Sequence, residues 1–269
     1  MIREPKPVRW VLRLFVICYV GLLVLWPVFL VAQRTLSPGW QAVVSSLSSP
    51  EVLLGLRLTG IATFWSVLFN LVFGVGISLL LVRYEFRGKR LLSVLLDLPL
   101  SVSPVVVGLA LMLVYAKGTP VGRFLYGIGY QIIFATPGIV LATTFVALPL
   151  VIREVVPVLT EIGDDQEVAA RSLGASGWQT FWRVTLPGIK WAVVYGVVLT
   201  LARSLGEFGA VKVVSGNISL QTQTATLVVQ DTYQDFQQQT AYTVSLLLTL
   251  AAVLCITVVA LLRPKEKLS

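Results

Sequence analysis

Six long apolar stretches constrain this chain more than any other feature of its sequence. Each approaches the roughly 20 apolar residues that an α-helix needs to cross the hydrocarbon core of a bilayer. The stretches cover residues 11–32, 58–82, 93–115, 137–157, 191–213 and 241–262. Backbone N–H and C=O groups must be satisfied within the protein at that depth, which favours helices. The sequence therefore predicts an all-α, polytopic membrane protein, a bundle of six transmembrane helices.

Charged residues are few, and their placement indicates how the chain is oriented. Only 13% of the residues are charged, whereas soluble domains have about 25%. Fifteen of the 21 basic residues fall on one side of the predicted spans. They are Arg3, Lys6, Arg9, Arg13, Arg83, Arg87, Lys89, Arg90, Arg153, Arg171, Arg183, Lys190, Arg263, Lys265 and Lys267. The positive-inside rule makes this side, with both termini, cytoplasmic. The net charge of +8 thus indicates orientation and some contact with anionic lipid, and gives no reason to expect nucleic-acid binding.

The chain reads as one membrane domain over residues 1–269. Residues 158–190 form its main cytoplasmic loop, and residues 214–240 form a polar external loop. A short amphipathic helix is expected near residues 226–236, where it could dock an external partner. Gly74 and Gly76 in the second span predict close helix packing, because small residues let membrane helices approach one another.

The cytoplasmic stretch 167–187, EVAARSLGASGWQTFWRVTLP, is polar in an otherwise apolar chain. A short helix is expected from Glu167 to Leu173, since its residues are good helix formers. Gly174 suits a left-handed C-cap that turns the chain sharply. A second short helix is expected from about Gly177 to Thr185, before Pro187. Its amphipathic face is formed by Trp178, Phe181, Trp182 and Val184. From these residues alone, an ordinary connecting loop and a functional loop are equally supported.

Charged residues inside predicted spans are the other candidates for function. Arg203, Glu207 and Lys212 lie in or at the edge of the fifth span, and Asp97 lies near the cytoplasmic end of the third. A charge near mid-membrane costs roughly 2.5–3.5 kcal/mol, so these side chains should face a bundle interior or an aqueous cavity. A translocation path and a structural interhelical ion pair both fit the fifth span. For Asp97, helix capping or pairing with Lys89 or Arg90 is supported equally with a transport role.

Several chemistries lack the residues they need. The sequence has no histidine and two cysteines, Cys18 and Cys255, both within spans, so no zinc site and no serine–histidine machinery is expected. The only Gly-Lys pair, Gly88-Lys89, lacks the rest of a phosphate-binding loop. We therefore expect a non-catalytic subunit that binds no metal or cofactor itself. Any ATP and magnesium would be bound by a partner chain.

Residues 169–187, with Ala169, Ala170, Gly174, Leu186 and Pro187 at their spacings, resemble the EAA loop of binding-protein-dependent ABC-importer permeases. The resemblance implies the type I ABC-importer permease fold and an ATPase-coupling role for this loop. The matched residues and Glu167 are its candidate coupling residues. In the family a glutamate lies six residues before the glycine, where this chain has Val168. Glu167 lies one residue earlier, about 100° around the helix, which leaves its role open.

The segments RSLGEFGAVKVVSGN and LGASGWQTFWRVTLP are most similar to W-type permease subunits of sulfate/thiosulfate importers. This resemblance implies a heterodimer with a companion T permease subunit, two ATPase subunits and a periplasmic sulfate-binding protein. It also implies that the chain forms half of the translocation pathway in a bacterial plasma (inner) membrane. A permease for another oxyanion such as molybdate, and an ion-coupled secondary transporter, remain alternatives.

Overall fold

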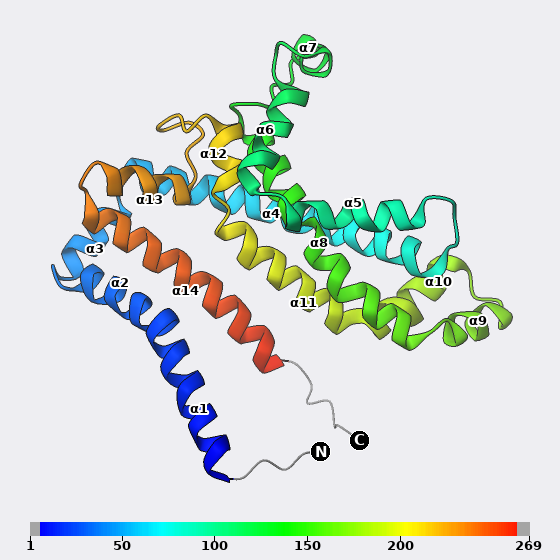
Figure 1. Ribbon diagram of the computed structural model, residues 1–269. Coiled ribbons are helices and arrows are strands. Elements are labelled where there is room, and N and C mark those ends of the chain that lie inside the picture. The colour runs from blue at the N-terminus through cyan, green and yellow to red at the C-terminus, as the bar shows by residue number, and fades with distance from the viewer. Residues whose placement is uncertain (1–5, 263–269) are drawn as a thin grey trace.

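The computed structural model describes residues 6–262, which form an elongated helical bundle (Figure 1). Four of the basic residues used to orient the chain, Arg3, Arg263, Lys265 and Lys267, lie outside this range. Within residues 6–262 the regular elements are all helices, as expected. They are α1 (Lys6–Val20), η1 (Gly21–Leu25), α2 (Trp26–Leu36), α3 (Trp40–Leu47), α4 (Pro50–Arg83), α5 (Lys89–Ser101), α6 (Pro104–Tyr115), α7 (Pro120–Gly127), α8 (Thr136–Ile162), α9 (Asp165–Ser172), α10 (Gly177–Thr180), η2 (Phe181–Thr185), α11 (Leu186–Leu205), α12 (Gly209–Ser215), α13 (Ala225–Gln234) and α14 (Gln238–Leu262). The two η elements are single π-helical turns.

Five helical runs in this range are long and apolar enough to cross a membrane, and the bent pair α5–α6 makes a sixth if counted as one span. The predicted third span, 93–115, is broken in two, because the chain bends by 115° between α5 and α6. Val102 between them is extended, and Ser103, with ψ 134°, is also outside the helical region. The residue before a proline disfavours the helical region, so Pro104 begins a new helix in a new direction.

The predicted fifth span, 191–213, is also interrupted. Helix α11 ends at Leu205 and α12 begins at Gly209. Gly206 has poor helix propensity, and the Glu207 carboxylate accepts a hydrogen bond from the Ala210 N–H. That bond satisfies an N–H at the start of the next helix, which stabilises the break. Of Arg203, Glu207 and Lys212, only Arg203 therefore lies inside α11.

The core of the bundle is the packing of α4, α8 and α11. Gly74 and Gly196 allow it: a Cβ on either would come within 2.9 Å of Val151 on α8. The prediction of close packing is therefore confirmed at Gly74. At Gly76 an added Cβ would meet nothing within 4 Å, so no described helix of this chain packs closely there. Gly76 is exposed because it lies on another face of α4.

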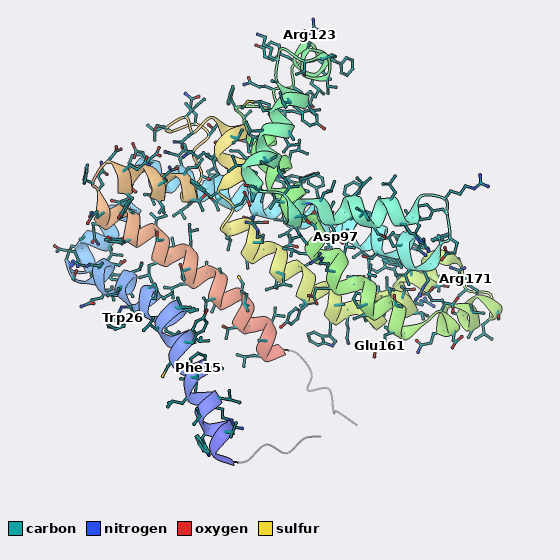
Figure 2. The ribbon with its side chains drawn as sticks, viewed as in Figure 1. Phe15, Trp26, Asp97, Arg123, Glu161 and Arg171 are labelled. Atoms are coloured by element: carbon teal, nitrogen blue, oxygen red, sulfur yellow. The ribbon has the colours of Figure 1, made fainter. Side chains whose placement is uncertain are left out.

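The segment α1–η1–α2 extends from the core, and its α2 packs on α14 and α3 (Figure 1). Large apolar side chains along it, such as Phe15 and Trp26, are exposed (Figure 2). Such exposure suits a helix whose surroundings are lipid or another apolar subunit, since neither leaves apolar surface in water.

Helices α9 and α10 lie at one end of the bundle, and α3 and α13 lie at the other (Figure 1). The predicted helix near residues 226–236 is confirmed as α13. The 167–187 loop and the polar 214–240 loop are thus separated by the length of α11.

Candidate functional site: the 167–187 hairpin and the broken fifth span

The first half of the 167–187 stretch is helix α9 and its C-cap. Gly174 has φ +87° and follows the helix, as predicted. Its N–H donates to Arg171 O at 2.9 Å, and the Ala175 N–H donates to Ala170 O at 3.0 Å. These two bonds form a Schellman motif, which satisfies carbonyls at the end of the helix. The sharp turn therefore depends on the left-handed backbone conformation at Gly174, which glycine adopts without a steric penalty.

The second half begins with a capping box. The Gln179 N–H donates to Ser176 Oγ at 3.3 Å, and the Ser176 N–H donates to Gln179 Oε1 at 2.9 Å. The expectation that this helix stops near Thr185 was wrong, because α10, η2 and α11 form one continuous helical run. The π turn changes the hydrogen-bond register just before Pro187, which therefore does not interrupt the run. The hairpin is joined rigidly to a transmembrane helix.

The outer face of the hairpin is apolar and open. Trp178 is 71% exposed and Leu173 is 90% exposed. The rings of Trp178 and Trp182 meet edge to face at 5.5 Å, whereas Phe181 is turned toward the core between α8 and α11. Beside them is a crevice of about 330 Å³. It is lined by Ala170, Leu173, Gly174, Ala175, Gln179, Thr180, Arg183 and Val184. Exposed apolar surface of this kind is typical of sites that interact with another protein or with a membrane.

Glu167 lies on the inner face of α9. Its side chain is 12% exposed and forms a bidentate ion pair with Arg83, the last residue of α4. Arg83 Nε donates to Oε2 at 3.1 Å, and one Nη donates to Oε1 at 3.2 Å. Val168 occupies the outer face and is 55% exposed. Adjacent residues of a helix point about 100° apart, so Glu167 faces the rest of the chain while Val168 faces outward, toward any partner.

The remaining predicted coupling residues differ in their surroundings. Ala169 is exposed, and Ala170 and Gly174 line the crevice. Leu186 packs against the core between α8 and α11, and Pro187 is exposed at the start of α11. The sequence pattern therefore locates the hairpin correctly but mixes residues of its outer and inner faces.

The break in the fifth span holds a buried carboxylate beside a half-buried cation. The Glu207 side chain is 2% exposed, and its Oε2 lies 2.7 Å from Arg203 Nη1. This contact is a close ion pair without the alignment of a hydrogen bond. Thr226 Oγ1 donates to the backbone carbonyl of Glu207 at 2.8 Å, which attaches α13 to the break. The Arg203 side chain is 36% exposed, so a cation is accessible at the end of α11.

Lys212 belongs to the same region, and Asp97 does not. Lys212 Nζ donates to Gln230 Oε1 at 2.9 Å and lies 5.4 Å from the Phe208 ring. Asp97 forms an exposed ion pair with Arg153 at 3.0 Å. This contact replaces the expected pairing of Asp97 with Lys89 or Arg90. It forms because α5 packs along α8, which brings Arg153 to Asp97. Lys89 pairs with Glu85 instead. The Asp97–Arg153 pair borders a separate crevice of about 240 Å³ between α5 and α8.

Sequence reasoning missed three residues that the structure places at these sites. Arg83 and Arg153 counted only as orientation signals. Thr185 counted only as a helix end, although its Oγ1 donates to Glu167 Oε1 at 2.8 Å. Their partners are distant in sequence, 84 residues for Arg83–Glu167 and 56 for Arg153–Asp97, so no local spacing indicates them. Within the described range no three His, Cys, Asp or Glu side chains are grouped as they would be to hold a metal.

Comparison with known proteins defines the class first. Residues 70–264 match the family described as "binding-protein-dependent transport system inner membrane component", and the chain belongs to this family. The fold agrees: a bacterial ABC transporter that imports the acidic polysaccharide alginate has a chain with TM-score 0.78 and 16% identity. The match covers 95% of this chain and 94% of that one. The protein is therefore a multi-pass membrane component of a transport system, with the ABC-importer permease fold.

The names of the curated relatives state a substrate as well as a class. The sulfate transport system permease protein CysW of Synechococcus elongatus is 47% identical over 92% of this chain and 86% of its own length. CysW of Escherichia coli K12 is 42% identical over 97% and 90%. CysT of the same Escherichia coli strain, also a sulfate transport system permease, is 34% identical over 88% and 85%.

Proposed function

We propose that this chain is a permease subunit of an ATP-driven sulfate/thiosulfate importer. The observation that carries this conclusion is the similarity, over nearly the whole chain, to relatives named as sulfate permeases. The chain would form half of the translocation pathway and pair with a T-type companion permease. Two ATPase subunits would bind from the cytoplasm, and a periplasmic sulfate-binding protein would deliver the anion. Both termini would be cytoplasmic, as the distribution of basic residues favours.

The hairpin supplies a physical basis for coupling. Trp178 and Leu173 offer apolar surface to an ATPase subunit, and the adjacent crevice offers a recess that its side chains can enter. Because α10, η2 and α11 are continuous, a displacement of the docked hairpin moves a transmembrane helix directly. Rocking of the packed α4–α8–α11 unit against a companion subunit would then open the path alternately to either side.

Arg203 is the best-placed side chain to attract the anion. It lies at a helix break and is partly exposed, and the carboxylate of Glu207 beside it is buried. Arginine presents several N–H donors in a planar fork and remains charged, which suits a tetrahedral dianion. Lys212, on the next helix, would add positive charge to the same end of the path.

Labelled sulfate uptake tests this function. The chain would be expressed with its companion permease, ATPase and binding protein in a cell that lacks sulfate transport. We expect uptake that disappears when the ATPase is withheld and that excess molybdate competes for poorly. Strong competition by molybdate would indicate that the same importer transports another oxyanion. Uptake that persists without the ATPase would contradict the coupled mechanism and favour a gradient-driven transporter.

A further inference from the structure

Arg83 joins three helices, α4, α8 and α9, beneath the hairpin. It is the last residue of α4, and its nitrogens donate to the Leu159 and Gly163 carbonyls at 3.2 and 2.7 Å as well as to Glu167. Those two carbonyls lie in the last turn of α8 and at its C-cap. The guanidinium thus holds the end of α8 with one side and the first turn of α9 with the other.

Glu167 completes the arrangement from the hairpin side. Its Oε1 accepts a hydrogen bond from Thr185 Oγ1 at 2.8 Å in addition to the bond from Arg83. Thr185 is the last residue of η2 and is buried. The carboxylate therefore connects α4, α9 and the helical run that continues into α11. We call the three side chains of Arg83, Glu167 and Thr185 the staple.

The staple is built unlike a surface ion pair. Arg83 and Glu167 side chains are only 14% and 12% exposed, and each accepts or donates more than one hydrogen bond. Bidentate arginine–carboxylate pairs are geometrically specific, and removing one buried partner leaves the other unsatisfied. Helix α9 otherwise packs mainly against α10 and η2, so the staple is its direct polar link to α4.

We propose that Glu167 is a positioning residue that transmits hairpin movement to α4, and that it does not contact the ATPase. This proposal rests on the ATPase coupling inferred above. The continuous helix joins the hairpin directly to α11, which packs against α4 and α8. The staple adds a direct polar link from the hairpin to α4 and the end of α8, so the three core helices move with it as one body. Contact with the ATPase is left to the exposed face that contains Val168, Leu173 and Trp178.

The test uses the complete transporter, purified and reconstituted in vesicles with its binding protein. Glu167→Gln, Arg83→Gln and the double variant would be compared with Glu161→Gln. Glu161 is an exposed acid near the end of α8 and is the matched control (Figure 2). Thr185→Val is a milder variant, since it removes one hydrogen bond and keeps the side-chain shape. The measurements are ATPase subunit content, ATP hydrolysis, and sulfate transported per ATP hydrolysed.

We expect each staple variant to retain its ATPase subunits and to hydrolyse ATP, while sulfate transported per ATP falls. A fall of about fivefold for Glu167→Gln is within the range by which residues distant from both ligands alter coupling. Thr185→Val should fall less, and Glu161→Gln should match the wild type. The double variant should be no worse than the more impaired single variant, because both substitutions remove the same interaction.

Three results would overturn the proposal. Wild-type transport per ATP in Glu167→Gln and Thr185→Val would show that the staple transmits nothing. Loss of ATPase subunits from Glu167→Gln would make Glu167 a contact residue instead. A proportional fall of hydrolysis, uptake and thermal stability would indicate a purely structural role. A wild-type transporter without ATP-driven uptake would refute the proposed function itself, which distinguishes that failure from failure of the staple alone.

Discussion

The two ends of α11 each hold a buried glutamate beside an arginine, yet the two pairs are built differently. At the hairpin end, Glu167 meets Arg83 from another helix, and both side chains have further hydrogen-bond partners. At the opposite end, Glu207 meets Arg203 from the preceding turn, and the arginine is 36% exposed. The first pair joins separate elements and is closed to solvent. The second keeps a carboxylate buried and leaves a cation accessible.

This difference in burial and partners suits the two ends of α11 to different roles. A fully satisfied buried network rigidifies its surroundings, because every broken contact would leave an unpaired charge. A pair with one accessible member can exchange its partner for an anion from solution. We therefore propose that the Glu167 end transmits movement and that the Arg203 end attracts the anion.

The comparison assumes that α11 is held rigidly between its ends, and Gly196→Val tests that assumption with the largest expected effect. A Cβ at residue 196 would lie 2.9 Å from the Val151 backbone Cα, so α8 and α11 would have to separate. We expect the free energy of unfolding to fall by about 1–3 kcal/mol, as overpacking typically does. Thermal unfolding in detergent measures it. Gly76→Val is the control, because that site is open; equal stability of the two variants would refute the packing.

Arg203→Gln addresses the exposed cation. We expect sulfate uptake to fall by about tenfold or more, since a hydrogen bond to a charged group contributes about 1.5–3 kcal/mol. Hydrolysis by the partner ATPase should continue, because the hairpin end is unchanged. The measurement is uptake normalised to the amount of permease in the membrane, with Arg203→Lys as a variant that keeps the charge. Normal uptake by Arg203→Gln would remove Arg203 from the translocation path.

Gly174→Ala tests the turn that orients the hairpin end. An added Cβ would meet nothing within 4 Å, so the only penalty is the backbone conformation at φ +87°. Left-handed backbone costs an L-residue about 1–2 kcal/mol. We expect a loss of stability of that order and a partial loss of uptake. Gly177→Ala, also free of clashes but at the start of α10, should change neither quantity; the same loss in both variants would contradict the role of the turn.

Asp97→Asn has the smallest expected effect. The Asp97 and Arg153 side chains are both more than half exposed, and exposed ion pairs contribute about 0–1 kcal/mol. Uptake and thermal stability should both stay near wild-type values. A large loss of uptake at normal membrane level would restore Asp97 to the translocation path that the sequence suggested for it.

Local sequence predicted the elements that depend on local causes. Five spans follow from the length of apolar runs, the hairpin turn follows from Gly174, and α13 follows from its amphipathic pattern. The breaks after Ser101 and Leu205 were missed, because an apolar run looks the same whether its helix is straight or bent. Pro104 and Gly206 were visible signals for both breaks.

By itself, the sequence determined that this is a helical membrane protein with a polar hairpin, because transfer of apolar residues into lipid and backbone conformation at glycine are local properties. Only the tertiary structure decided what the charged residues do. It placed Arg83 against Glu167, Arg153 against Asp97, and Glu207 behind Arg203. The physical reason is that the free energy of a charge depends on its burial and its partners. For Glu167 and Asp97 those partners come from helices far away in the chain.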